Sequence, residues 1–135
     1  MICLNDLLSK IDNVTTDSGE NFRVAFTDNI ELIEDDIGDI TDLVSRIRNA
    51  ACHMSSDIRI VNEPEVGGVV SFVFNIVEGK SRIKVINDFV IECEFEDDIA
   101  IYYGVLRIYL KRHIHRALDE AKQIILPLIR PHFYR

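Results

Sequence analysis

The stretch VVSFVFNIVEGKSRIKVINDFVIECEFE, residues 69–96, carries the clearest β-strand pattern of the chain. Val69–Val77 is rich in β-branched and aromatic residues and predicts one strand, after which residues 78–79 form a turn. Arg82–Ile86 is expected to pair back as a second strand. Phe89–Phe95 then alternates apolar side chains with acidic ones, a pattern typical of an antiparallel sheet with one solvated face.

Two amphipathic helices flank this stretch. Over Ile37–Met54, apolar residues recur every three or four positions, with acids in the first turns and arginines near the end, which suits the helix dipole. A long helix is predicted over Ile99–Leu126, and Pro127 is expected to end or kink it. A shorter helix that begins near Val105, after a break at Gly104, is the alternative.

Shorter elements complete the predicted order. They are a helix over Leu4–Ile11, strands over Phe22–Phe26, Ile30–Ile33 and Ile58–Val61, and an irregular tail over Ile129–Arg135. The helices interrupt the strands without strict alternation, so the sequence predicts the α+β class. We expect an antiparallel sheet of about four to six strands with helices packed on one face and a long C-terminal helix. With 135 residues, the chain is expected to form a single domain over residues 1–135.

Composition and charge argue against several classes of protein. The chain is 47% hydrophobic and 28% charged, like an ordinary globular protein. The formal net charge of −8 argues against nucleic acid as a partner. No run of about 18 apolar residues occurs, so no membrane span is expected. The three cysteines are widely spaced without a CxxC pair, and no secretory signal is recognised, so we expect a reduced, cytoplasmic protein.

Motifs of known enzymes are absent from the sequence. It contains no GxGxxG, GxxxxGK[ST], GxSxG or HExxH, so we predict no enzyme, no cofactor and no metal site. His113 and His115 would share a face only on a strand, and on a helix they diverge. His115 and Asp119 could share a metal or a proton on a helix, but such pairs usually face solvent. Cys93 alternates with phenylalanines and is expected in the core.

Acidic and basic residues are unevenly distributed along the chain. Residues 1–100 hold 21 acidic and 8 basic side chains, whereas residues 101–135 hold 2 and 7. Asp28–Asp42 contains seven acids and no base, and Glu92–Asp98 contains five more acids. Two interpretations are open. Either the runs are solvated faces, with the basic C-terminal helix lying over the acids of its own fold, or they form a surface for a basic partner.

The function predicted from this layout is a non-catalytic protein-binding module. It would mask or neutralise a basic protein partner, as immunity and inhibitor proteins do. The residues predicted to pair with Lys or Arg of the partner are Glu34, Asp35, Asp36, Asp39, Asp42, Glu92, Glu94 and Glu96. In size, acidity and its mixture of helices and strands, the chain resembles small bacterial protein-masking factors: immunity proteins of toxin systems, phage-type inhibitors and secretion chaperones.

A second likeness concerns the C-terminal half. The predicted strands of Val69–Phe95, the helix over Leu106–Ala121 and the segment Ile125–Leu128 followed by Phe133 are similar to the tail of SecB-type chaperones. The glycine expected after the helix is missing, and a helix over Ile37–Met54 interrupts the sheet. This resemblance implies a chaperone or adaptor that binds an extended client.

Such a chaperone would need an exposed apolar groove beside the sheet. Residues such as Phe72 and Phe74 would line it, and the protein would be a homodimer. Self-association is expected for a second reason, because the long C-terminal helix exceeds the needs of one domain. Its apolar tail residues would require cover: Leu126, Leu128, Ile129 and Phe133. A small enzyme with an unrecognised site is the remaining alternative.

Overall fold

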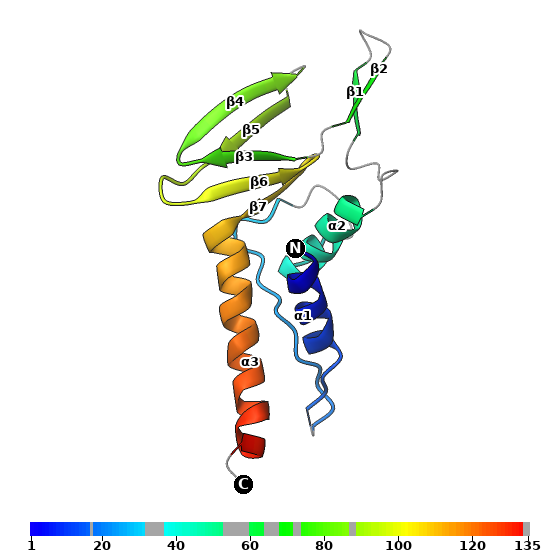
Figure 1. Ribbon diagram of the computed structural model, residues 1–135, viewed down its shortest axis with the longest axis vertical. Helices are drawn as coiled ribbons and strands as arrows, with labels where there is room; N and C mark the ends of the chain where they lie inside the picture. The colour runs from blue at the N-terminus through cyan, green and yellow to red at the C-terminus, as the bar shows by residue number, and fades with distance from the viewer. Residues whose placement is uncertain are drawn as a thin grey trace.

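A computed structural model shows three α-helices and seven strands in the residues that it describes (Figure 1). These residues are 1–16, 18–31, 37–52, 60–63, 68–71, 74–86 and 89–133. The elements, in chain order, are α1 (Ile2–Asp12), α2 (Ile40–Cys52), β1 (Ile60–Glu63), β2 (Gly68–Ser71), β3 (Asn75–Glu78), β4 (Ser81–Ile86), β5 (Phe89–Cys93), β6 (Ile99–Tyr103), β7 (Leu106–Tyr109), a π-helical segment (Leu110–His115) and α3 (Arg116–Phe133).

The strands pair antiparallel in three separate groups. β1 pairs with β2, β4 pairs with β5, and β3, β6 and β7 form a three-stranded sheet with β6 in the middle. The α+β class is confirmed, but a single sheet of four to six strands is wrong, since the largest sheet in the described residues has three strands. The predicted strand Val69–Val77 contributes to two groups, through β2 and β3. Arg82–Ile86 pairs forward with β5 instead of back with β3.

The three-stranded sheet separates two hydrophobic clusters, because alternate residues of a strand point to opposite faces. Leu106 and Ile108 of β7 are buried against the helices. On the opposite face, Ala100, Tyr102 and Tyr109 are buried with residues of β3 and β5. The helices therefore pack on one face, as predicted, and β5 lies over the other (Figure 1).

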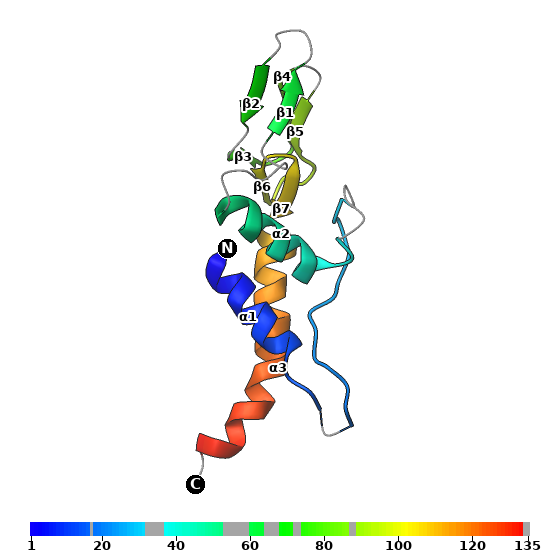
Figure 2. The ribbon, with the colours of Figure 1, turned by 90° about the vertical axis from the view of Figure 1, so that its right-hand side faces the viewer.

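The helices enclose the larger of the two clusters. α1 places Leu4, Leu8 and Ile11 on its buried face, which confirms the predicted short helix. α3 contributes Ala117 and Ala121 to this cluster, and α1 lies beside α3 (Figure 2). Each fully buried Leu or Ile contributes about 1.5–3 kcal/mol to stability, so this cluster is the main source of cohesion among the helices.

The predicted helix over Ile37–Met54 is present but begins three residues later, as α2. Asp39 caps it, because its Oδ1 accepts a hydrogen bond from the backbone N–H of Asp42 at 3.0 Å. Its apolar stripe faces the core through Ile40, Leu43, Val44, Ile47 and Ala50, whereas Ala51, which the helical spacing also predicted on this stripe, is exposed. Met54 lies outside the described residues.

The predicted long helix over Ile99–Leu126 is wrong in its first half. Its first residues form the hairpin of β6 and β7, which turns at Gly104 with a φ of 59°. Nearly every residue of this hairpin is apolar, so the sequence satisfies the helical and the strand period equally well. Burial on both faces of the sheet decides for strands, and the helix begins only at Leu110, after the alternative start near Val105.

The C-terminal end of the helix also differs from the prediction. α3 continues through Pro127 to Phe133, so the predicted irregular tail is wrong up to that residue, and residues 134 and 135 lie outside the described part. Proline lacks the N–H that would bond four residues back, which bends a helix. Figure 2 shows the last turns of α3 leaning away from the line of the preceding turns.

The predicted strand Phe22–Phe26 is wrong as a strand, although its alternation is right. Val24 and Phe26 are buried, but no described strand pairs with this segment. Their carbonyl oxygens accept hydrogen bonds from α2 instead. The Oγ1 of Thr41 donates to Val24 at 2.7 Å, and the N–H of Ile40 donates to Phe26 at 3.1 Å. The N-terminus of α2 thus replaces a strand neighbour.

Two shorter predictions have mixed outcomes. Ile30, the first residue of the predicted strand Ile30–Ile33, is not in a strand, and the last two residues of that range lie outside the described part. The predicted strand Ile58–Val61 corresponds to β1, which is described from Ile60 onward.

Candidate functional site

Arg23 forms ion pairs with two of the carboxylates that the sequence predicts to bind a partner. Its Nε lies 2.7 Å from Oδ2 of Asp39, and its Nη2 lies 2.6 Å from Oδ1 of Asp42. The Nη1 atom adds Asp12 of α1 at 2.7 Å. These hydrogen bonds hold the pKa of Arg23 above its ordinary value. Asp39 is only 8% exposed, so this pair serves primarily to tie α2 to its own fold.

Three other predicted partner-binding residues, Glu34, Asp35 and Asp36, lie outside the described residues. Glu31 precedes them, in the same acidic run, and is described. The Nη2 atom of Arg107 contacts Oε1 of Glu31 and lies 2.9 Å from Oε1 of Glu94. Arg107 therefore brings the two acidic runs of the sequence together at one point in space.

Arg107 contacts these two carboxylates from the buried side. Its side chain is 5% exposed, whereas those of Glu31 and Glu94 are 47% and 51% exposed. Burial alone would lower the pKa of Arg107, but the attractions of Glu31, Tyr109 and Tyr102 and the hydrogen bond to Glu94 together outweigh burial and keep the pKa above the ordinary value. The guanidinium also lies over the ring of Tyr109, 5.0 Å from its centre. The cation is therefore fixed, and the carboxylates face outward.

More acids continue this surface along the loop between β5 and β6. Glu96 and Asp97 are exposed in this loop, and Glu78 is exposed at the end of β3. The turn at Gly79 lies against the loop, since its N–H donates to the carbonyl of Asp98 at 3.1 Å. We call this surface the acidic edge and define it by Glu31, Glu78, Glu94, Glu96 and Asp97.

The acidic edge adjoins a shallow hollow on the β4–β5 ribbon. The hollow has a volume of about 470 Å³ and is lined by Lys80, Ser81, Arg82, Glu92, Cys93 and Glu94. Glu92 is half-buried and lies 3.6 Å from the Nε of Arg82. The structure thus places Glu92, Glu94 and Glu96 near one another. It does not bring Asp39 or Asp42 into this group, because both contact Arg23.

Asp98, the last acid of the second run, is buried and belongs to the fold. Its Oδ1 accepts hydrogen bonds from the N–H groups of Ile99 and Lys111, both at 2.8 Å. Its Oδ2 accepts from the backbone N–H of Arg112 at 3.1 Å and from Nη1 of the same residue at 2.9 Å. Burial would raise the pKa of Asp98, but these four donors together hold it below its ordinary value.

This carboxylate caps the start of the π-helical segment from a distant loop. The first N–H groups of a helix have no partner within the helix, and Asp98 satisfies those of Lys111 and Arg112. Tyr109, the residue at the N-cap position, provides no side-chain cap of its own. The second acidic run therefore divides into a buried capping residue and the exposed acids before it.

Two arginines, Arg112 of the π-helical segment and Arg116 at the start of α3, lie over acids of their own fold. Arg112 pairs with Asp97 at 3.0 Å, in addition to its contact with Asp98. Arg116 pairs with Asp28 and Glu120, both at 2.8 Å. This arrangement is the first of the two interpretations that the charge layout left open. These ion pairs account for some of the acids in each run. Glu78 and Glu96, the outer acids of the acidic edge, remain exposed.

The histidines of this region do not form a metal pair. His113 is fully buried, while His115 is exposed. The N–H of Tyr109 donates to Nδ1 of His113 at 3.1 Å, and the carbonyl of Asp28 lies 3.0 Å from its Nε2. Nε2 therefore carries the proton of a neutral ring, and burial lowers the pKa of His113.

Other sites weighed from the sequence are accounted for in the described residues. Cys93 is buried in the smaller hydrophobic cluster, which confirms its predicted place in the core. Within the described part of the chain, no group of three or more His, Cys, Asp or Glu side chains is arranged to hold a metal ion. None of the described helices is both long and apolar enough to cross a membrane.

Comparisons with known proteins do not assign this site. The chain matches no family model, and no curated protein and no solved structure gives a significant match.

Sequence reasoning missed three members of the acidic edge. Glu31 and Asp97 belong to the two acidic runs but were not singled out, and Glu78 lies outside both runs. The runs themselves were the signal for the first two residues. Only the packing of the Gly79 turn against the β5–β6 loop reveals Glu78.

Proposed function

We propose that this protein is a non-catalytic binding module that masks a basic protein partner through the acidic edge, as an inhibitor or immunity protein does. One observation carries the proposal: buried Arg107 gathers Glu31 and Glu94 from two distant acidic runs and leaves both carboxylates half exposed. Carboxylates that are already fixed lose little conformational freedom when they bind a cation, which favours affinity.

Long-range electrostatics supports the same function. The formal net charge of −8 attracts a basic partner and increases its association rate at low salt. The outer acids of the edge strengthen this field, because Glu78 and Glu96 form no ion pair with any other described residue. The hollow beside Glu92 and Glu94 offers room for a Lys or Arg side chain of the partner.

The test begins with tagged protein used to capture partners from the lysate of its source, washed in steps of rising salt. The partner is then purified, and its affinity for two charge-matched variants is measured. One variant carries Glu78→Lys and Glu96→Lys on the acidic edge. The control carries Asp6→Lys and Glu20→Lys, at exposed acids of α1 and of the loop after it. Each double change raises the net charge by 4, from −8 to −4.

We expect a stoichiometric basic partner that salt releases. The acidic-edge variant should bind it at least about tenfold more weakly, since each lost charge contact at an interface contributes on the order of 1 kcal/mol. The control should lose much less affinity. Equal losses in the two variants would show that only net charge matters and would refute a role for the acidic edge.

A chaperone or adaptor for an extended client is the second candidate, and one feature favours it. Phe74 and Ile76 are 50% and 56% exposed beside β3, which is an edge strand of its sheet. The ring of Phe74 also contacts the ring of Tyr103 edge to face, with ring centres 5.3 Å apart. An extended client could pair with this strand and cover both apolar side chains. Phe72, the other predicted residue of this groove, lies outside the described residues.

The two candidates respond oppositely to salt. Binding to the chaperone groove should persist at high salt and disappear in Phe74→Ser, whereas binding to the acidic edge should be released by salt and be unaffected by that change. Ile83→Ser is a matched control, because Ile83 is equally exposed, at 50%, on another strand.

A further inference from the structure

α3 carries a second apolar stripe besides the one that is buried in the core. Ala117 and Ala121 are fully buried against the core. Rotated about 100° around the helix from them is the stripe Leu118, Lys122, Ile125 and Ile129. Its members are spaced four, three and four residues apart, the spacing of a coiled-coil seam. Leu118 and Ile129 are 42% and 41% exposed, whereas Ile125 is partly buried against the core, so the described residues leave the two ends of this seam uncovered.

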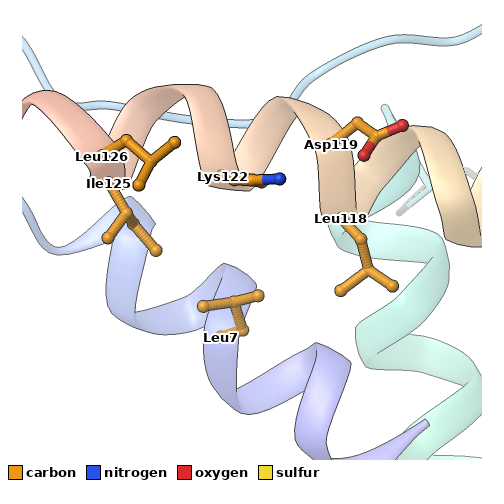
Figure 3. Close-up of a pocket in the computed structure, with 6 residues that line it drawn as sticks. All are labelled: Leu7, Leu118, Asp119, Lys122, Ile125 and Leu126. Atoms are coloured by element: carbon orange, nitrogen blue, oxygen red, sulfur yellow. The ribbon is translucent and has the colours of Figure 1, made fainter.

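This second seam forms one wall of a groove between α1 and α3. Leu7 of α1 faces it, and the groove has a volume of about 380 Å³ (Figure 3). Its apolar lining is Leu7, Leu118, Ile125 and Leu126, and its charged lining is Asp119 and Lys122. Figure 3 shows Asp119 and Lys122 one turn apart on the same side of α3. The groove therefore presents an apolar floor beside one acid and one base.

This pattern is complementary to itself. In a two-fold symmetric pair, each surface meets its own copy, so an acid on one side must find a base at the symmetric position. If two α3 helices lie antiparallel, Leu118 lies opposite the partner's Ile125, and Asp119 lies opposite the partner's Lys122. Exact alignment of Leu118 with Ile125 and exact alignment of Asp119 with Lys122 require helix registers that differ by two residues, or about 3 Å along the helix axis. The long side chain of Lys122 spans this difference.

The local charge permits such a pairing in spite of the acidic chain. Residues 116–129 of α3 contain two bases and two acids, so this segment is neutral, whereas the whole chain has a net charge of −8. Two copies can therefore approach along α3 without the repulsion that their acidic edges would cause. A basic residue at one seam position, Lys122, also resembles the polar seam residues that fix register and orientation in coiled coils.

We propose that the groove between α1 and α3 is occupied by α3 of a second copy of this chain, in an antiparallel homodimer related by a two-fold axis near Lys122. The helices would interdigitate Leu118, Ile125 and Ile129 across the axis. The two Lys122 side chains would extend away from the axis and from each other, so that each contacts Asp119 of the second copy at the rim. This inference is independent of the proposed function, because the acidic edge and the groove share no residue.

Sedimentation equilibrium of the full chain over a range of concentrations tests for the dimer. We expect wild type to dimerise and Leu118→Glu or Ile125→Glu to raise the dimer dissociation constant at least about tenfold, as loss of a central apolar contact does. Gln123→Glu is the matched control, since Gln123 is exposed on α3 and is not part of the seam. Its dissociation constant should stay within about twofold of wild type. Circular dichroism confirms that all variants keep their helices.

A charge exchange tests the register and the two-fold symmetry. Asp119→Lys alone places two bases opposite each other in its own dimer, and Lys122→Asp alone places two acids opposite each other. Each single variant should therefore dimerise more weakly than wild type. An equimolar mixture of the two should form heterodimers, because the changed charges then face their opposites at both contacts. No other use of this face, as a site for a small apolar molecule or an unrelated helix, produces that rescue.

Two results would overturn a dimer through this groove. One is a wild-type chain that stays monomeric at every concentration. The other is a wild-type dimer that Leu118→Glu and Ile125→Glu do not weaken, because such a dimer uses another surface. A mixture of charge variants that fails to associate while wild type dimerises would refute the antiparallel register.

Discussion

Replacing Asp98 with Asn should destabilise the protein far more than any change at the neighbouring exposed acids. The Asp98 carboxylate is fully buried and accepts four hydrogen bonds, from Ile99, Lys111 and twice from Arg112. Asn keeps one acceptor oxygen but presents an NH₂ donor to the two N–H groups that faced Oδ2. Two hydrogen bonds to a charged group are lost, and each contributes about 1.5–3 kcal/mol.

We therefore expect Asp98→Asn to lower the free energy of unfolding by about 3 kcal/mol, the lower end of the range for breaking a buried ion pair. Urea unfolding followed by circular dichroism measures this value. With a slope of about 1–3 kcal/mol/M for a small protein, the midpoint should fall by roughly 1–3 M. Asp97→Asn is the control, because Asp97 is 64% exposed and makes one ion pair. It should cost at most about 0.5 kcal/mol.

The effect should also depend on pH in a defined direction. The pKa of Asp98 is lower in the fold than its ordinary value of 3.8, so the folded state favours the ionised form. Its contribution is fully present above that ordinary value and is lost as the pH falls through the depressed pKa. The difference between wild type and Asp98→Asn should therefore be largest near neutral pH and shrink below about pH 4. An Asn variant as stable as wild type at pH 7 would refute the capping role.

Two further predictions concern the helices. Arg23→Ala should lower the free energy of unfolding by about 1–2 kcal/mol after allowance for solvent screening, because it leaves three carboxylates facing one another without their cation. Arg82→Ala, at a side chain that is 71% exposed, should change thermal stability little. Because burial lowers the pKa of His113 below 6.5, the fold favours the neutral ring, and wild type should lose stability as the pH falls from 7 to below that value. In urea titrations at several pH values, His113→Gln should reduce this pH-dependent loss of stability. His115→Gln is the control and should not reduce it, because its ring is exposed. The reasoning is contradicted if the unfolding free energy changes equally with pH in wild type and both variants.

The parts of the fold that could be predicted are those with one amphipathic face. α1 and α2 each bury a single stripe, so the helical period is visible in the sequence. The β6–β7 hairpin could not be recognised, because Ile101 and Tyr102 pack into different clusters and leave no polar face. A strand that is buried on both sides has no alternation of apolar and polar residues in its sequence. The one sequence signal for the turn was Gly104, which adopts a positive φ in the structure.

The candidate site was predictable at the level of acidic runs and not at the level of single carboxylates. Asp39, Asp98 and Glu94 look alike in the sequence, but each owes its role to a cation or N–H group far away in the chain. Asp39 contacts Arg23, and Glu94 contacts Arg107, in both cases across more than ten residues. Sequence spacing does not reveal such pairs.

The positions of the acids relative to the helices explain how each run divides between fold and surface. Asp39 and Asp98 both accept N–H groups at the beginning of a helical segment, where a buried carboxylate gains most from the helix dipole. Acids a few residues away, such as Glu96, have no N–H group to cap and remain on the surface. Reversing the charge at Glu96 should therefore alter binding but not folding, whereas the same change at Asp98 should prevent folding. An acidic run beside the start of a helix thus provides both a helix cap and an exposed charged surface. Because the capping acids are buried, the net charge of the chain overstates the number of acids that a partner can contact.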